Sequence, residues 1–120
     1  PTEALLGDGL MDARKCISYL TIELKGEIEQ KFQGKWENWI FGCDICQEVC
    51  PWNRKPIQYQ LTDFEPRIGL MGIRSELLAK KEDSVLEARI LGTPLKRAGI
   101  QKLKSNIETI ISIAGQNKGQ

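Results

Sequence analysis

Apolar residues recur at helical spacing in the stretch 13–24 (ARKCISYLTIEL). This spacing predicts a helix with one buried face. Asp12 is a suitable N-cap before it, and Gly26 is expected to end it. A shorter helix is predicted over 27–33 and closes at Gly34. The apolar positions of the first helix are Cys16, Ile17, Leu20 and Leu24.

A second apolar stripe lies near the end of the chain and stops at Gly115. Thr93 and Pro94 precede it as an N-cap and a first-position proline. Upstream, residues 84–87 (SVLE) form a capping box that predicts another helix, with Gly92 at its end. Residues 75–82 predict one more short helix. The stripe consists of Ile100, Leu103, Ile107, Ile110, Ile111 and Ala114.

The remaining stretches carry no clear period. Residues 1–11 contain GDG at 7–9 and are interpreted as a turn or short helical piece followed by a loop. Residues 52–73 are expected to form an irregular connector. No stretch alternates apolar and polar residues as a strand would, so the predicted fold class is mainly α.

Composition narrows the chemistry that the chain can perform. The 120 residues suit one small domain or a piece of a larger one, and the net charge of +1 leaves any basic surface local. No apolar run approaches a membrane span and no signal-peptide pattern is present, so a cytoplasmic, monomeric protein without membrane contact is expected. Histidine is absent, which excludes His-ligated zinc and Cys-His nucleophiles.

The four cysteines carry the strongest motif. Cys43, Cys46 and Cys50 form a C-x2-C-x3-C-P run with Pro51, which is a bacterial ferredoxin run whose first ligand position holds Ile40. This spacing favours an iron–sulfur cluster over zinc, which usually takes paired C-x2-C units. Cys16 lies on the apolar face of its helix. A buried structural cysteine is one interpretation, and a fourth metal ligand is the favoured one.

Three segments resemble epoxyqueuosine reductase. Residues 10–23 (LMDARKCISYLTIE) and 40–53 (IFGCDICQEVCPWN) look like the second half of that family's ferredoxin-like domain. Residues 92–97 (GTPLKR) and the following helix resemble the entry into its C-terminal, HEAT-like helical region. The resemblance implies a ferredoxin-like half over 1–55, and a connector with helical C-terminal region over 56–120.

The family resemblance also implies an activity. It is that of a cobalamin-dependent oxidoreductase with two [4Fe–4S] clusters, which takes electrons from an external donor and reduces epoxyqueuosine to queuosine in tRNA. Pro1 then corresponds to the proline closing an upstream cysteine run. The chain would therefore be a C-terminal fragment that is not catalytically complete by itself.

The resemblance assigns the four cysteines to two clusters. Cys16, Cys43 and Cys46 would serve one cluster, with a fourth ligand before Pro1. Cys50 would reach across to the other cluster.

Other residues have a functional and a structural interpretation. By resemblance, Ser18 and Thr21 would lie near cobalamin or tRNA, although helix hydroxyls commonly bond backbone carbonyls instead. Lys25 could contact a phosphate or simply complement a helix dipole. The three tryptophans around the cysteine run are expected to shield the cluster rather than stack on bases.

Four basic residues cluster at the start of the last long helix. They would contact the tRNA backbone or form a solvated helix face. They are Lys96, Arg97, Lys102 and Lys104.

Two other functions remain open. One is a generic iron–sulfur electron-transfer protein or a fragment similar to a reductive dehalogenase. The other is a zinc-stabilised helical interaction module.

Overall fold

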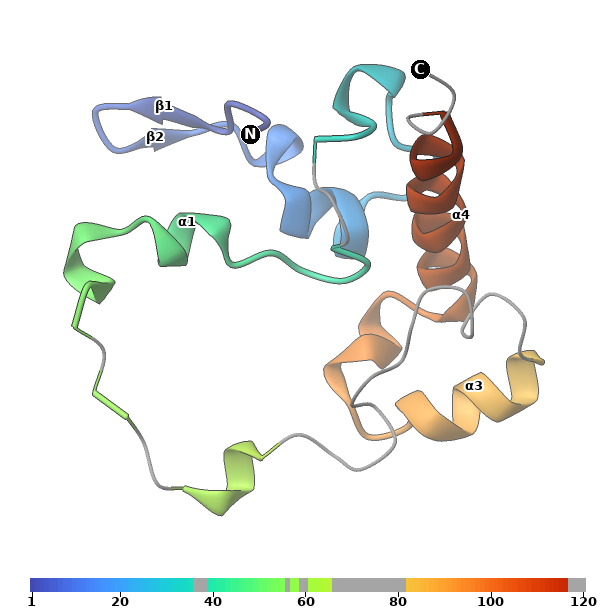
Figure 1. Ribbon diagram of the computed structural model, residues 1–120. Coiled ribbons are helices and arrows are strands. Elements are labelled where there is room, and N and C mark those ends of the chain that lie inside the picture. The colour runs from blue at the N-terminus through green and yellow to red at the C-terminus, as the bar shows by residue number, and fades with distance from the viewer. Residues whose placement is uncertain (36–38, 56, 59–60, 66–81, 117–120) are drawn as a thin grey trace.

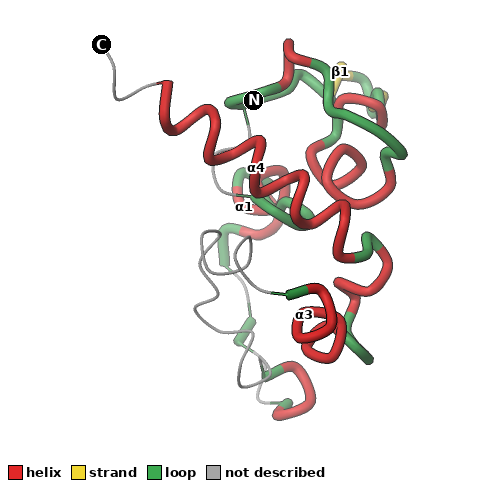
Figure 2. Tube along the Cα trace, turned by 90° about the vertical axis from the view of Figure 1, so that its right-hand side faces the viewer, coloured by secondary structure: helices red, strands yellow, loops and turns green. Residues whose placement is uncertain are grey.

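The computed structural model describes residues 1–35, 39–55, 57–58, 61–65 and 82–116. This part of the chain is mainly helical, as predicted. A small β-hairpin stands at the N-terminal side, and the long C-terminal helix α4 (Ile100–Gln116) runs along the opposite side (Figure 1). Helix α3 (Asp83–Ile90) lies beside the N-terminal end of α4 (Figure 2).

The interpretation of residues 1–11 as lacking strands is wrong. Strands β1 (Leu5–Gly7) and β2 (Leu10–Met11) pair antiparallel, with Leu5 opposite Met11. Asp8 in the connecting turn has a φ of 50° between two glycines of positive φ, a backbone that short polar residues and glycine tolerate. The hairpin's leucines and methionine are all exposed. Because neither face is buried, no alternating pattern marks it in the sequence.

The stretch 13–24 is helical but not one regular α-helix. A 3-10 turn, η1 (Ala13–Lys15), is followed by η2 (Tyr19–Glu23), which is wound as a π-helix. The predicted cap is confirmed, because the Asp12 carboxylate accepts a hydrogen bond from the Arg14 backbone N–H at 3.1 Å. The predicted burial of Ile17 and Leu20 is also confirmed.

The helices of the C-terminal part begin at different residues from those predicted. Helix α3 starts at Asp83 with Glu82 as its N-cap, so the predicted capping box at Ser84 is wrong. Pro94 starts a 3-10 turn, η6 (Pro94–Arg97), rather than the long helix. Helix α4 buries the predicted stripe through Ile110, whereas Ile111 is 42% exposed. The helix predicted over 75–82 lies outside the described residues, apart from its last residue.

The other described elements are short. They are η3 (Gln30–Phe32), which occupies part of the predicted 27–33 helix, α1 (Ile45–Glu48), η4 (Pro51–Asn53) and η5 (Thr62–Phe64).

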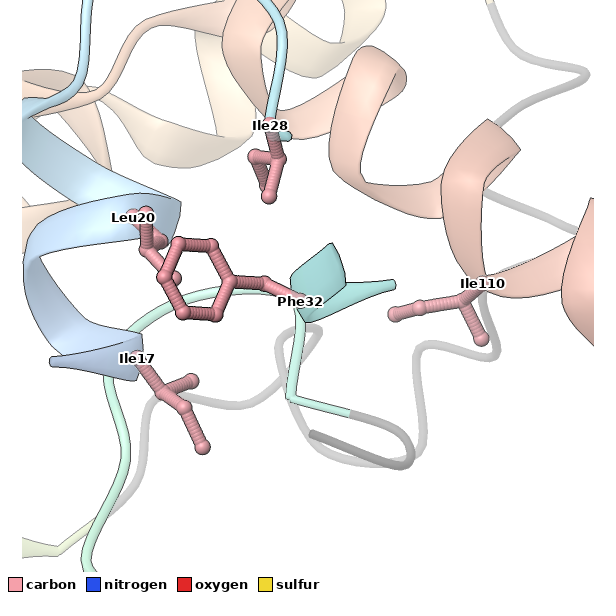
Figure 3. Packing of buried hydrophobic residues seen from close by; sticks show 5 residues of the cluster. All are labelled: Ile17, Leu20, Ile28, Phe32 and Ile110. Carbon is pink, nitrogen blue, oxygen red and sulfur yellow. The ribbon is translucent and has the colours of Figure 1, made fainter. Parts of the chain in front are cut away.

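Two apolar cores meet along α4. In the first, Ile17, Leu20, Ile28, Phe32 and Ile110 converge from four segments of the chain (Figure 3). The second joins α3 to the N-terminal half of α4 through Leu86, Ile90, Ile100, Leu103 and Ile107. Ile40 packs against both cores. Helix α4 therefore supports the segments that carry the cysteines.

The chain on either side of residue 55 packs together, because Ile110 belongs to the same core as Ile17. The division at residue 55 and the HEAT-like character of the C-terminal part stay predictions. No helix in the described ranges is both long and apolar enough to cross a membrane.

Candidate metal centre

Three of the four cysteines line one pocket. The pocket has a volume of about 430 Å³ and lies between the N-terminal hairpin and α1. Cys16 borders it from the turn between η1 and η2, Cys43 from the loop before α1, and Cys46 from α1 itself. Cys50 does not line this pocket. Cys16, Cys43 and Cys46 therefore share one pocket, and Cys50 lies outside it.

The pocket wall is mostly apolar. Leu5 and Met11 of the hairpin and Val49 after α1 line it, and each of these side chains is more than half exposed. Apolar walls lower the local dielectric around a metal site and limit the access of water.

Cys16 is held by the turn around Asp12. The Asp12 carboxylate accepts hydrogen bonds from the Arg14 backbone and from its guanidinium, at 2.9 Å and 3.0 Å for the latter. These contacts with Arg14 lower the pKa of the Asp12 carboxyl. Cys16 follows as the C-cap of η1, with its backbone N–H bonded to Ala13.

A buried polar junction connects the Cys16 helix, the Cys43 loop and α4. The Thr21 hydroxyl donates to the Ile17 carbonyl at 2.8 Å and accepts from the Gly42 N–H at 3.1 Å. The Asn106 side-chain amide donates to the Thr21 carbonyl at 2.8 Å and the Ile40 carbonyl at 2.9 Å. Both side chains are fully buried. The junction fixes the loop before Cys43 relative to the helix that follows Cys16.

Asn106 has one orphaned atom in this junction. Two carbonyl oxygens face its side-chain amide. The amide nitrogen points toward them, because only the nitrogen can donate hydrogen bonds. Its Oδ1 has no hydrogen-bond partner among the described residues.

Cys50 is positioned by a separate set of contacts. It is the N-cap of η4, and its N–H donates to the Gln47 carbonyl at 3.3 Å. The Asn53 side-chain amide donates to both the carbonyl and the side-chain oxygen of Gln47, at 3.0 Å and 3.1 Å. These bonds tie η4 to α1 and hold Cys50 at the corner between them.

The pocket disfavours negative charge on the Cys43 thiol. Burial, and then the neighbouring Cys46 and Cys16, raise the pKa of the Cys43 thiol. A bound cationic metal centre reverses this preference, because coordinating thiols are deprotonated.

The described cysteines do not converge on one point. Within the described ranges, no three cysteine, aspartate or glutamate side chains are close enough to hold a single metal ion. A tetrahedral zinc needs thiolates about 2.3 Å from one ion.

The two hydroxyl residues predicted near cobalamin or tRNA lie in different environments. Ser18 lines the cysteine pocket, and its hydroxyl donates to the Cys43 carbonyl at 3.5 Å. Thr21 has no exposed surface and its hydroxyl is engaged on both sides. The expectation that Thr21 lies against a cofactor or tRNA is therefore corrected to a structural role.

The predicted basic residues do not form one free surface. Arg97 pairs with Glu23 at 2.6 Å, and Lys104 pairs with Asp83. Lys96 is exposed. Lys102 is half-buried and lines a second pocket together with Lys25.

The tryptophans differ from the expectation of shielding. Trp39 packs against the first core, but Trp52 is 94% exposed. Trp36 lies outside the described residues. Trp52 therefore shields nothing in the described part of the chain.

Asn106 belongs to the site but is not predicted from the sequence. Its signal is a polar residue between Leu103 and Ile110, at helical spacing on an otherwise apolar face. Such a residue needs a buried partner, but the sequence does not reveal that its partners lie beside Cys16 and Cys43.

The part of the chain that carries the cysteines matches a known family. Residues 1–53, which include all four cysteines, match a family described as a 4Fe-4S double cluster binding domain. Epoxyqueuosine reductase from Cellulophaga algicola is 42% identical over 108 residues, covering 90% of this chain and 35% of the relative. The resemblance to epoxyqueuosine reductase is confirmed.

Two further epoxyqueuosine reductases support this result. The protein from Cyclobacterium marinum is 44% identical over 92% of this chain and 34% of its own length. The protein from Pseudomonas aeruginosa is 44% identical over 89% of this chain and 30% of its own length. The chain thus spans about a third of the epoxyqueuosine reductases it matches. No solved structure matches it significantly.

Proposed function

We propose that this chain supplies iron–sulfur ligands for an epoxyqueuosine reductase. The observation that carries the proposal is the single pocket shared by Cys16, Cys43 and Cys46, with Cys50 outside it. A domain that holds two clusters needs this division, because the last cysteine of each run ligates the other cluster. We assign the first three cysteines to one [4Fe–4S] cluster and Cys50 to the second.

The donor set fits this cofactor. All four cysteines are free thiols, and thiolates are the ligands that iron–sulfur clusters take. Each cluster takes four thiolates, so two clusters need further ligands besides the four cysteines of this chain. When bound, the clusters supply single-electron transfer.

The residues of this chain would orient and shield the clusters. The Thr21–Asn106 junction would orient the loop before Cys43 relative to the helix that follows Cys16, and the Asn53–Gln47 contacts would orient Cys50. The apolar side chains of Leu5, Met11 and Val49 would limit water at the first cluster.

The wider activity follows from the relatives. We propose that the whole protein reduces epoxyqueuosine to queuosine in tRNA in the cytoplasm, with cobalamin as a further cofactor and an external electron donor. Ser18, at the cysteine pocket, is the candidate residue for contact with cobalamin or tRNA. The exposed Lys25 and Lys96 are candidate contacts for tRNA, with Lys102 at the second pocket.

The alternatives have weaker support. A generic electron-transfer protein would share the cluster pocket, but the epoxyqueuosine reductases match this chain far beyond residues 1–53. A zinc-stabilised module has less support, because the C-x2-C-x3-C-P spacing is that of an iron–sulfur site and residues 1–53 match a 4Fe-4S double cluster binding domain.

Metal analysis of the whole protein, purified anaerobically, tests the cofactor. We expect iron and acid-labile sulfide in equal amounts, with little zinc, because the ligands suit cubane clusters. The same preparation should convert epoxyqueuosine to queuosine in tRNA, followed by nucleoside analysis. Stoichiometric zinc without iron would contradict the cluster assignment. Iron–sulfur clusters without conversion of the tRNA nucleoside would favour the generic electron-transfer protein.

A further inference from the structure

A second pocket brings two lysines together away from the cysteines. It has a volume of about 400 Å³ and lies between the loop 24–27 and the start of α4. Lys25 lines it from the loop and Lys102 from the first turn of the helix. The two residues lie far apart in the sequence. The fold therefore creates this pair, and no local charge run predicts it.

The loop side of the pocket depends on its backbone shape. Gly26 has a φ of 112°, a conformation that residues with a side chain rarely adopt. The Gly26 carbonyl accepts a hydrogen bond from the Lys102 ammonium at 3.3 Å. This bond ties the helix lysine to the loop and leaves the other ammonium hydrogens available, because a lysine carries three donors.

The positive charge at this pocket is only partly balanced. Neither Lys25 nor Lys102 forms an ion pair among the described residues, whereas Arg97 and Lys104 nearby in sequence do. Burial, and then the charge of Lys25, lower the pKa of Lys102. Glu27 also lines the pocket and is its only carboxylate among the described lining residues. An added anion would relieve the repulsion between the two ammonium groups.

The remaining lining residues suit an oxyanion. Gln101 and Ser105 contribute an amide and a hydroxyl from α4, both of which can donate hydrogen bonds. The pocket also lies at the N-terminal end of a 17-residue helix, where the helix dipole favours negative charge.

We propose that the pocket between residues 24–27 and the start of α4 binds a phosphate group of the tRNA backbone, held by Lys25 and Lys102. This inference rests on the proposed function for its RNA substrate. It goes further by selecting two of the predicted cations as a shared phosphate site and by assigning Arg97 and Lys104 to internal ion pairs. The same chemistry would accept free inorganic phosphate, which the experiment distinguishes.

The salt dependence of tRNA binding tests the site in the cluster-loaded holoprotein. For Lys25→Gln/Lys102→Gln, we expect weaker binding, and a slope of log K against log salt concentration that is smaller by about 1, because one phosphate contact is lost. Lys25→Gln alone should weaken binding in the same direction. Its side chain is exposed, so this variant separates binding from folding. Lys35→Gln, an exposed lysine that does not line the pocket, is the matched control.

Each outcome decides the proposal. An unchanged slope and affinity in both lysine variants, with a wild-type protein that binds tRNA, would overturn the phosphate site alone. A wild-type protein that binds no tRNA would overturn the proposed substrate as well. If inorganic phosphate shifts the NMR signals of Lys25 and Gly26 while both variants bind tRNA normally, the pocket takes free phosphate and the RNA assignment is wrong.

Discussion

In the whole protein, Cys16→Ser should remove one [4Fe–4S] cluster and leave the second. The reason is that Cys16 shares its pocket with Cys43 and Cys46, whereas Cys50 lies outside. Serine keeps the size of the side chain but is a poor ligand for iron in place of a thiolate. The variant should retain about half of the wild-type iron and sulfide, since each cluster has its own four ligands. Iron and acid-labile sulfide analysis after anaerobic purification measures this.

The other cysteines and a neighbouring serine provide the comparison. Cys43→Ser and Cys46→Ser should lose the same cluster, with the same electron paramagnetic resonance signal missing after reduction. Cys50→Ser should lose the other signal. Ser18→Ala changes the same pocket without removing a thiol, so it should keep its full iron. Wild-type iron in Cys16→Ser would show that Cys16 is a core residue and no ligand.

Asn106→Leu should destabilise the protein by about 2 kcal/mol, because the two carbonyls that lose their donor outweigh the removal of the unpartnered Oδ1. The substitution keeps a side chain of similar size but leaves the buried carbonyls of Thr21 and Ile40 without their donor, and each unsatisfied buried group costs about 1–3 kcal/mol. Thermal and denaturant unfolding of the cluster-loaded protein would measure the loss. Cluster retention should also fall, because the junction sets the loop before Cys43.

Two variants on the same helix sharpen this prediction. Asn106→Asp places a carboxylate against the same two carbonyls, so it should be at least as destabilising as the leucine. Glu108→Gln alters an exposed position two residues away and should leave stability within about 0.5 kcal/mol. If Asn106→Leu unfolded at the wild-type midpoint, the junction would have no role in holding the fold.

Residue spacing predicts the parts of this fold that bury a periodic apolar face. The stripe from Ile100 to Ile110 becomes α4, and Ile17 with Leu20 becomes part of the first core. The cap at Asp12 also follows from local chemistry, because its carboxylate bonds the next turn whatever lies elsewhere. The hairpin is not predicted, because Leu5 and Leu10 are exposed and the sequence therefore shows no alternation of buried and exposed residues.

The site is only partly visible in the sequence for a related reason. The spacing of Cys43, Cys46 and Cys50 indicates a cluster. This spacing does not predict which of the thiols share a pocket. Pairing Cys16 with Cys43 depends on contacts between Thr21, Gly42 and Asn106, which lie up to 85 positions apart. The π-helical winding of η2 is likewise not predicted, because the sequence of 19–23 fits an ordinary helix.

The division of the cysteines between two clusters is tested most directly by iron content in two double variants. Substituting two ligands of the same cluster should lose no more iron than substituting one of them. Substituting one ligand of each cluster should lose the sum of the two single losses. We predict that Cys16→Ser/Cys43→Ser retains as much iron and sulfide as Cys16→Ser alone, while Cys16→Ser/Cys50→Ser loses nearly all of both. If Cys16→Ser/Cys50→Ser retained as much iron as Cys16→Ser alone, the assignment of Cys50 to a second cluster would be wrong.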